Sequence, residues 1–319
     1  RHSAEPFGQD PEARHPQDPR RLSRPRPLPV ETGSAGVTHL MSTTESKALN
    51  GVRVVSLAIN LPGPLAASRL AEMGASVTKV EPPSGDPLRA VVPGWYAELV
   101  GDQEVVELDL KSTAGRAEFE ARLASADVLL TSMRPSALDR LGLADSAERY
   151  GLVLIEIVGY AGERADEGGH DLTYQAVQGT VLPPAMPLVP TVDLLGSERA
   201  VSATLAALML RAASGAGVRR RVVLEDAAIV ASASVRHGLT GPGDVLGGAL
   251  PSYGIYAASD GHVAVGAVEP HFAERLAVHV GATKGELTAA FAAQGTTHWE
   301  DLGRHHDIPI VAVRDPRER

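Results

Sequence analysis

From residue 50 onwards, the chain alternates between short runs of β-branched residues and stretches with helical periodicity. Residues 52–57 (VRVVSL) and 75–81 (ASVTKVE) are apolar runs typical of buried strands. Between them, residues 62–73 begin with prolines and place their apolar side chains on one helical face, and Gly74 suits a left-handed helix cap. The pattern predicts a strand, a helix and a second strand, which together form a βαβ unit with parallel strands.

The same alternation continues further along the chain. More strands are predicted at 105–110, 126–131 and 152–158, and a helix is predicted at 113–124. We therefore expect an α/β fold, with a Rossmann-like doubly wound sheet that is covered by helices on both faces. The Gly-x-Gly-x-x-Gly motif of dinucleotide-binding folds does not follow the first strand, which argues against a dinucleotide cofactor.

The pattern changes after Asp193. Residues 198–213 are rich in Ala and Leu and predict a buried helix, and residues 253–266 predict a β-hairpin that turns at Asp260-Gly261. Antiparallel strands after an α/β region indicate a second, smaller α+β domain. We therefore divide the chain into a large Rossmann-like domain (46–238), a small domain (239–296) and a carboxyl-terminal segment that returns towards the large domain (297–319).

The first residues differ in composition from the rest. Residues 1–40 are rich in Pro and Arg and show almost no apolar periodicity, so we expect residues 1–45 to form a disordered leader. Met41 resembles a natural start, because organised sequence begins only a few residues later.

Composition narrows the class of protein. With 319 residues, of which 44% are hydrophobic and 22% charged, the chain can bury a sizeable core. The absence of cysteine excludes disulfides and a thiolate nucleophile, and the eleven histidines form no spaced ligand set, so no metal is expected. The formal net charge of −9 argues against nucleic-acid binding. No apolar run approaches the length of a membrane span, so we expect a cytoplasmic protein.

An imidazole and several carboxylates stand where acid/base chemistry could use them. Residues 168–175 (GGHDLTYQ) contain His170 and Asp171, and Asp193 lies in a later segment. Each carboxylate also has a structural interpretation. Asp193 could cap the apolar helix that follows it, Asp171 could cap the helix in which it lies, and Glu269 could complement a helix dipole.

Many short segments, in order and spacing, resemble the type III CoA-transferase (CaiB/BaiF) family, and within it the α-methylacyl-CoA racemase branch. The segments are LNGVRVV (49–55), GP (63–64), LAEMGASV (70–77), KVE (79–81), LDLK (108–111), ADVL (126–129), RP (134–135), LGL (141–143) and VGAVEP (265–270). The resemblance implies an interlocked homodimer. Each subunit would have a large Rossmann-like domain and a small domain, with the active site between subunits.

The resemblance to the racemase branch also implies roles for three residues. His170 and Asp193 would be the pair that removes and returns the α-proton of a 2-methylacyl-CoA-like thioester, and Glu269 would hold the imidazole. This chemistry is coherent, because inverting a stereocentre next to a thioester carbonyl needs one group to remove the proton and a second group to return it on the opposite face. A carboxylate neighbour would favour the charged form of the imidazole.

Two alternatives remain open. In the transferases of the family, an aspartate in the segment of Asp171 becomes acylated and then carries CoA, so the protein could move CoA between carboxylic acids. His170 favours the racemase form, because Gly-His-Asp resembles the racemases. The protein could also be a divergent homologue that acts on a substrate not presented on CoA, or that only binds.

The chain departs from the family where CoA would bind. Residues 81–83 (EPP) lack the usual arginine, and residues 101–104 (GDQE) are acidic where the family is basic. The gap between the two proposed proton carriers is also shorter than in the racemases. CoA is expected as part of the substrate, with no cofactor bound permanently. The cations that remain as candidate phosphate partners are Lys79, Arg89, Lys111 and Arg134.

Overall fold

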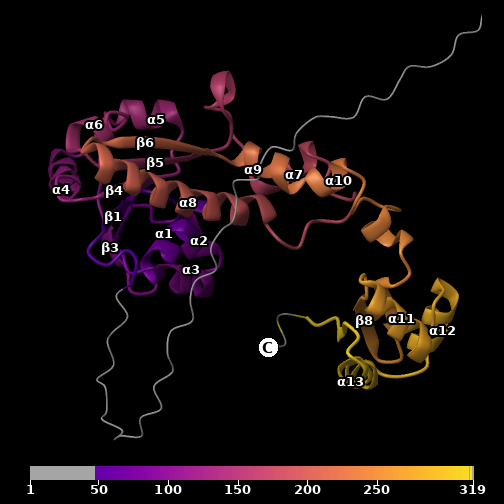
Figure 1. Ribbon diagram of the computed structural model, residues 1–319. Coiled ribbons are helices and arrows are strands. Elements are labelled where there is room, and N and C mark those ends of the chain that lie inside the picture. The colour runs from indigo at the N-terminus through magenta and orange to yellow at the C-terminus, as the bar shows by residue number, and fades with distance from the viewer. Residues whose placement is uncertain (1–46, 316, 318–319) are drawn as a thin grey trace, which may run out of the picture. The chain divides into compact units, whose positions relative to one another are not determined.

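A six-stranded parallel sheet, with the strand order β3-β2-β1-β4-β5-β6, forms the centre of the larger body (Figure 1). The computed structural model describes residues 47–315 and residue 317, so the predicted leader and Met41 lie outside the described residues. The strands are β1 (Arg53–Ser56), β2 (Ser76–Glu81), β3 (Glu104–Glu107), β4 (Val128–Thr131), β5 (Val153–Val158) and β6 (Val218–Val223).

Alternate side chains of the strands enter two separate cores, one on each face of the sheet. Val54 of β1 packs with α1 (Pro62–Glu72), α8 (Thr191–Ser214) and α9 (Leu224–Ala231). Val55 packs on the opposite face with α4 (Thr113–Leu123), α5 (Pro135–Arg140) and α6 (Ser146–Tyr150). The remaining helices of this body are α2 (Pro87–Val91), α3 (Pro93–Val100), α7 (Asp171–Val177) and the short η1 (Gly162–Arg164). The expected doubly wound α/β architecture is therefore confirmed.

Two elements differ from the sequence pattern. The strand expected at 105–110 ends at Glu107. The helix expected at 198–213 begins earlier, at Thr191. It is also only partly buried, since one of its apolar side chains, Met209, is 74% exposed. The earlier start has a tertiary cause, because the carboxylate of Asp171 accepts hydrogen bonds from N–H groups in the first turn of α8.

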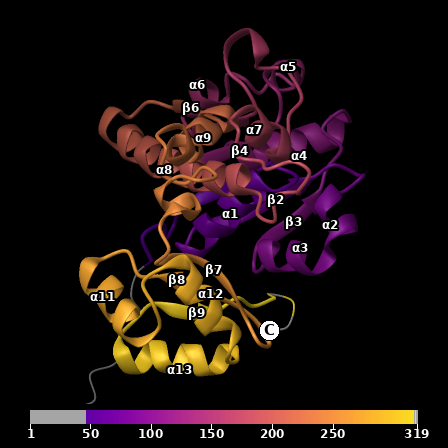
Figure 2. The ribbon, with the colours of Figure 1, turned by 90° about the vertical axis from the view of Figure 1, so that its right-hand side faces the viewer.

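A second, antiparallel sheet has the strand order β7-β8-β9 (Figure 2). Its buried apolar side chains form a core of their own. Its strands are β7 (Tyr253–Ala258), β8 (Gly261–Gly266) and β9 (Ile310–Ala312), and its helices are α11 (Pro270–His279), α12 (Lys284–Ala292) and α13 (Thr296–His306). Tyr256 stacks on Phe291, which in turn meets the edge of Trp299. Along the chain, α10 (Ala233–Arg236) and the short η2 (Val245–Ala249) follow α9 and precede β7.

The second sheet corrects two expectations. The hairpin turns at Ser259 and Asp260, with Ala258 paired to Gly261, so Gly261 belongs to the strand and not to the turn. The sequence pattern predicts that segment 297–319 returns towards the large domain. Instead β9 pairs with β8, and Trp299 is buried in the core of the second sheet, because this small sheet needs a third strand and a covering helix to bury its apolar face.

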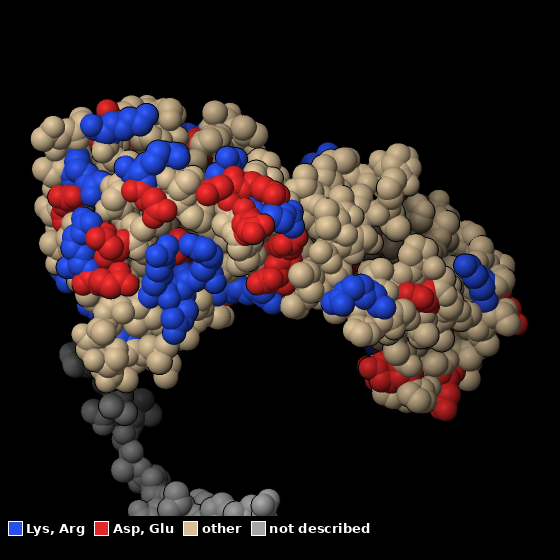
Figure 3. All heavy atoms as spheres, turned by 90° about the horizontal axis from the view of Figure 1, so that it is seen from above, with Lys and Arg blue, Asp and Glu red and all other residues tan. Residues whose placement is uncertain are grey.

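Acidic and basic side chains are interleaved on the face drawn in Figure 3. Among the described residues, several arginines pair with a carboxylate three or four positions away along the chain, as Arg149 does with Asp145 at 2.6 Å. This face is therefore not a uniformly basic surface. Among the helices that the structure describes, none combines the length and the apolar character needed to cross a bilayer.

Candidate active site

A cleft of about 440 Å³ opens at the carboxyl edge of the parallel sheet. Ligands of open α/β sheets bind at this edge, because the loops that follow parallel strands converge there. One wall comes from the chain after β1, β4 and β5, and the other from the start of α7 and of α8. The lining includes Asn60, Ser132, Arg134, Gly159, Gly169, His170, Thr173, Tyr174 and Asp193.

His170 stands directly before α7, in extended backbone conformation. The hydroxyl of Thr173 accepts a hydrogen bond from the main-chain N–H of His170 at 3.0 Å and donates one to its carbonyl at 2.8 Å. These two bonds fix the main chain at the helix start. The imidazole-bearing residue is therefore held at one wall of the cleft by its own helix.

Asp193 lies in the first turn of α8 and lines the same cleft as His170. The interpretation of Asp193 as the cap of this helix is wrong, because the cap position is occupied by Pro190. Burial, and secondly the negative charge of Asp171, raise the pKa of Asp193 to about 7. A carboxyl group with this pKa can hold or release a proton near neutral pH.

Asp171 caps α8, although it lies in α7. One of its carboxylate oxygens accepts hydrogen bonds from the main-chain N–H groups of Val192 at 2.7 Å and Asp193 at 3.1 Å. The other oxygen accepts a bond from Gln175 at 2.6 Å. The expectation that Asp171 caps its own helix is therefore corrected, and the early start of α8 has its explanation, since a carboxylate satisfies the N–H groups of its first turn.

Tyr174 lines the cleft as well, although no motif of the sequence marks it as a functional residue. Its side chain is buried, and burial is the main cause that raises its pKa, so the phenol keeps its proton. The one sequence feature that points to Tyr174 is the pair of glycines before His170. Gly169 of this pair leaves room for the tyrosine ring, which a Cβ atom at that position would meet.

A second cavity, of about 290 Å³, adjoins the cleft on the side of β2 and β3. Its lining is mostly apolar and includes Leu57, Val80, Pro82, Pro83, Leu108, Leu110 and Met133. The two cavities share Ile59, Asn60 and Ser132. These residues follow β1 and β4, the neighbouring strands at which the strand order reverses, so both cavities lie at the topological switch point of the sheet.

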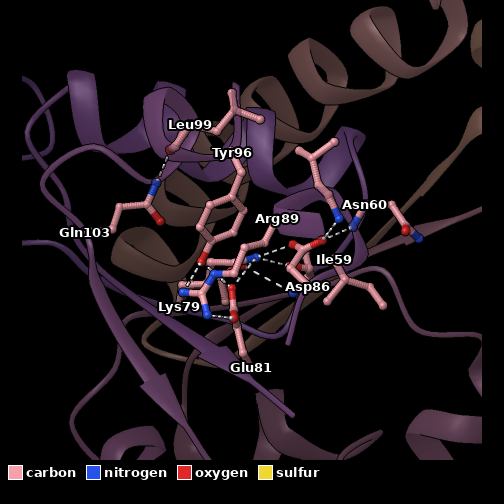
Figure 4. A network of polar contacts seen from close by, with 12 residues as sticks. Ile59, Asn60, Lys79, Glu81, Asp86, Arg89, Tyr96, Leu99 and Gln103 are labelled. Carbon is pink, nitrogen blue, oxygen red and sulfur yellow. Dashed lines mark hydrogen bonds and ion pairs between the residues drawn. The ribbon is translucent and has the colours of Figure 1, made fainter. Parts of the chain in front are cut away.

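The structure corrects the expectation that Lys79 contacts phosphate. Its ammonium lies 2.7 Å from the Asp86 carboxylate and 3.8 Å from that of Glu81, and it donates a hydrogen bond to the Ala58 carbonyl at 3.0 Å. Figure 4 shows these side chains pointing toward one another. Since Lys79 is only 2% exposed and already faces two carboxylates, it is a structural cation.

The other three candidate cations differ in their surroundings. Arg89 stacks on the ring of Tyr96, whose hydroxyl accepts a bond from Arg89 at 3.1 Å and donates one to Glu81 at 2.6 Å (Figure 4). Burial and the Glu81 carboxylate raise the pKa of Tyr96 to about 12. Lys111 is exposed at the apolar cavity, and Arg134 is exposed at the cleft. Lys111 and Arg134 are therefore the candidates that the structure brings to the cavities.

Glu269 lies in the second body, at the cap position of α11. Its carboxylate makes no capping bond, and within the described part of the chain no hydrogen bond joins it to His170. The structure therefore brings together His170, Asp171 and Asp193, whereas the role of Glu269 stays a prediction. No group of three or more His, Asp or Glu side chains that could hold a metal ion occurs among the described residues.

Comparison with known proteins decides the family. The model of CoA-transferase family III matches residues 49–319. This chain belongs to CoA-transferase family III. A CaiB/baiF CoA-transferase family protein of Caenorhabditis elegans is 26% identical over 305 residues, which cover 85% of this chain and 87% of that protein. The expected family is thus confirmed, and with it the expectation of an enzyme.

Named transferases of the family align with part of the chain. The (R)-2-hydroxy-4-methylpentanoate CoA-transferase of Clostridioides difficile is 31% identical over 57% of this chain, and the succinate–glutarate CoA-transferase of Agrobacterium fabrum is 31% identical over 65%. These alignments cover 51% and 59% of the two transferases. The chain thus spans only between half and three fifths of these two relatives.

Solved structures confirm the fold of the family. A hypothetical protein from Mycobacterium tuberculosis superposes with a TM-score of 0.72 at 23% identity, covering 86% of this chain and 87% of that protein. A CAIB/BAIF family protein from Brucella suis superposes with a TM-score of 0.67 at 22% identity, over 86% of this chain and 87% of that protein. At this level of identity the likeness concerns the fold alone.

Proposed function

We propose that this family III protein catalyses a racemase or epimerase-type 1,1-proton transfer at the α-carbon of an acyl-CoA thioester. The observation that supports this proposal is the pairing of His170 and Asp193 in one cleft, with the pKa of Asp193 raised to about 7. Acid/base catalysis is most effective when the pKa of the group lies near the working pH.

The reaction needs two groups in opposite protonation states. In one direction, the neutral imidazole of His170 takes the α-proton, and the C–H electron pair moves into an enolate whose negative charge lies on the thioester oxygen. The protonated carboxyl of Asp193 then returns a proton to the opposite face of the same carbon. In the reverse direction the carboxylate of Asp193 removes the proton and the imidazolium returns one.

We further propose that the two adjoining cavities hold the two ends of an acyl-CoA. We place the nucleotide end of CoA in the apolar cavity beside Lys111, and the thioester in the cleft beyond Asn60 and Ser132. Arg134 would hold a phosphate at the rim of the cleft. Two exposed cations at these positions would partly replace the arginine that the family usually has and that this chain lacks at Pro82.

CoA transfer through Asp171 is the second candidate, and the names of the transferases in the family favour it. In that reaction the carboxylate of Asp171 would attack the thioester carbonyl and release CoA thiolate, forming a mixed anhydride. Its two oxygens already accept three hydrogen bonds, at 2.7, 3.1 and 2.6 Å. Attack would require one oxygen to leave these bonds, so this contact pattern favours proton transfer.

Incubation of the purified protein with a 2-methylacyl-CoA in D₂O, with and without an added carboxylic acid, separates these reactions. Proton transfer predicts α-deuteration with loss of stereochemistry, which His170→Ala and Asp193→Asn abolish. His305→Ala is the matched control, since His305 is an exposed histidine of α13. Movement of CoA to the added acid, lost in Asp171→Asn, would overturn the proposal in favour of transfer. Neither reaction, together with no CoA binding in calorimetry, would indicate a substrate not presented on CoA or a binding function only.

The family resemblance implies an interlocked homodimer, and we propose that Glu269 of a second subunit holds His170. Co-expression of His170→Ala and Glu269→Ala chains tests this arrangement. In a random mixture half of the dimers are mixed, and each mixed dimer has one intact site, so about a quarter of the sites should regain activity. If verified mixed dimers regain no activity, the arrangement is contradicted, since His170 and Glu269 of one site would then come from the same subunit.

A further inference from the structure

Tyr174 is held rigidly in the wall of the cleft that contains His170 and Asp193. It is only 2% exposed, and its ring meets the ring of Tyr160 edge to face, with the centroids 5.3 Å apart. The ring belongs to the core between the sheet and α8. Packing therefore fixes the direction of its hydroxyl group.

Two glycines make room for that hydroxyl. A Cβ atom built on Gly159 would lie 2.4 Å from the Tyr174 hydroxyl oxygen, and one built on Gly169 would lie 2.5 Å from it. Neither glycine has a positive φ, so the space and not the backbone conformation requires glycine there. Gly159 follows β5 and Gly169 precedes His170, and both line the cleft. The hydroxyl thus occupies a narrow slot at the cleft wall.

No partner within the described residues accepts or donates a hydrogen bond at the Tyr174 hydroxyl. The described side-chain atoms that are sealed from solvent without any partner are Gln103 Oε1 and Arg122 Nε, and the Tyr174 hydroxyl is not among them. It therefore opens into the cleft. A buried phenol usually finds a partner, because leaving its O–H unpaired costs about 1–3 kcal/mol. An otherwise buried donor that faces a cleft indicates a ligand oxygen as that partner.

We propose that the Tyr174 hydroxyl donates a hydrogen bond to the thioester oxygen of the substrate while negative charge develops on it. This inference rests on the proposed proton transfer. When the α-proton leaves, the C–H electron pair forms the carbon–carbon double bond of the enolate, and the carbonyl pair moves onto oxygen. The phenol stabilises that oxygen and keeps its own proton, because burial and the nearby acidic groups hold its pKa above the usual value. A preorganised donor of this kind contributes to the rate and little to ground-state binding.

The test compares Tyr174→Phe with Tyr160→Phe. Both changes remove one phenolic oxygen and keep the ring, but Tyr160 does not line the cleft. For solvent exchange of the α-hydrogen, Tyr174→Phe should lower kcat by about 10²-fold and change KM by less than about threefold, since loss of one oxyanion donor costs about 10²–10³ in kcat. Tyr160→Phe should keep kcat. The melting temperature of Tyr174→Phe should not fall, because the lost hydroxyl has no protein partner. A wild-type rate in Tyr174→Phe, or a change confined to KM, would overturn the inference.

A second measurement separates this inference from the proposed function. Acetoacetyl-CoA forms a stable enolate with its own near-ultraviolet absorption, so binding of this probe reports enolate stabilisation without turnover. The unsubstituted protein should increase the enolate absorption, and Tyr174→Phe should lose most of the increase while Tyr160→Phe retains it. Failure of the proposed function would appear as no α-exchange by the unsubstituted protein. Equal enolate absorption in both variants would refute the role of Tyr174 itself.

Discussion

Replacement of Asp193 by Asn should make the protein more stable, and the gain should depend on pH. The amide keeps the size of the carboxyl group but does not ionise. Asp193 is held in a place where burial and the charge of Asp171 oppose ionisation, which raises its pKa from 3.8 to about 7. The folded protein therefore carries a cost at this position that the variant lacks.

The magnitude follows from the difference between the folded and unfolded pKa. Above about pH 7 the carboxyl is ionised in both states, and the shift of about three units corresponds to about 4 kcal/mol of destabilisation at 1.4 kcal/mol per unit. Below about pH 4 it is protonated in both states and the cost disappears. Between these limits the folded state binds more protons than the unfolded state, so this contribution lowers stability as the pH rises. Since Asp193 is only partly buried, we expect about 2–4 kcal/mol.

Urea unfolding of both proteins, from about pH 4 to about pH 8, measures the effect. The difference in unfolding free energy, variant minus wild type, should grow through this range in favour of Asp193→Asn. Titrating groups that do not interact with Asp193 are common to both proteins and cancel in the difference, and Asp171 is the one neighbour whose charge is coupled to it. A constant difference across the range, or a variant that loses stability at the upper end, would refute a carboxyl group of raised pKa at this site.

The remaining predictions concern the neighbouring carboxylate and the cations. Asp171→Asn should lower the pKa of Asp193, because a repelling charge is removed, and should therefore shift the pH profile of α-exchange to lower pH. The same change should cost about 1 kcal/mol of stability, because it weakens the cap of α8. An unmoved pH profile in a folded variant would contradict the coupling. Lys79→Met should destabilise the fold by about 3–5 kcal/mol, as it leaves the Asp86 carboxylate buried without its cation; chemical unfolding checks this, and a loss below about 1 kcal/mol would contradict the buried pair. Lys111→Ala should raise KM for an acyl-CoA about tenfold without lowering stability, since one phosphate contact is worth about 1–2 kcal/mol; steady-state kinetics with an unchanged KM would place CoA elsewhere.

Much of the larger body was predictable from local pattern. The runs at β1, β2 and β5 are β-branched and short, and parallel strands buried on both faces need this composition whatever surrounds them. The helix start at Pro62 was equally readable, because proline fixes the first turn there. These features depend on neighbours along the chain, and that is why the fold class followed from the sequence.

The interpretation of single polar residues was less successful. The local sequence allows Asp193 to be a helix cap and Lys79 to be a phosphate partner, because each lies in a segment where such roles are common. The cap of α8 comes instead from Asp171, and Lys79 is enclosed by Asp86 and Glu81. A carboxylate or an ammonium takes its role from the charges within a few ångströms, and those charges lie on other elements.

The sequence by itself determined the family, the order of the elements and the segments in which the chemistry lies, since these depend on periodicity and on motifs of adjacent residues. Only the tertiary structure decided that His170 and Asp193 share a cleft, that the Asp171 carboxylate is occupied by the start of α8, and that the Tyr174 hydroxyl faces the cleft between two glycines. Periodicity records which face of an element is buried. It does not record which buried groups of different elements meet, and proton affinity and hydrogen-bond partnership depend on that meeting.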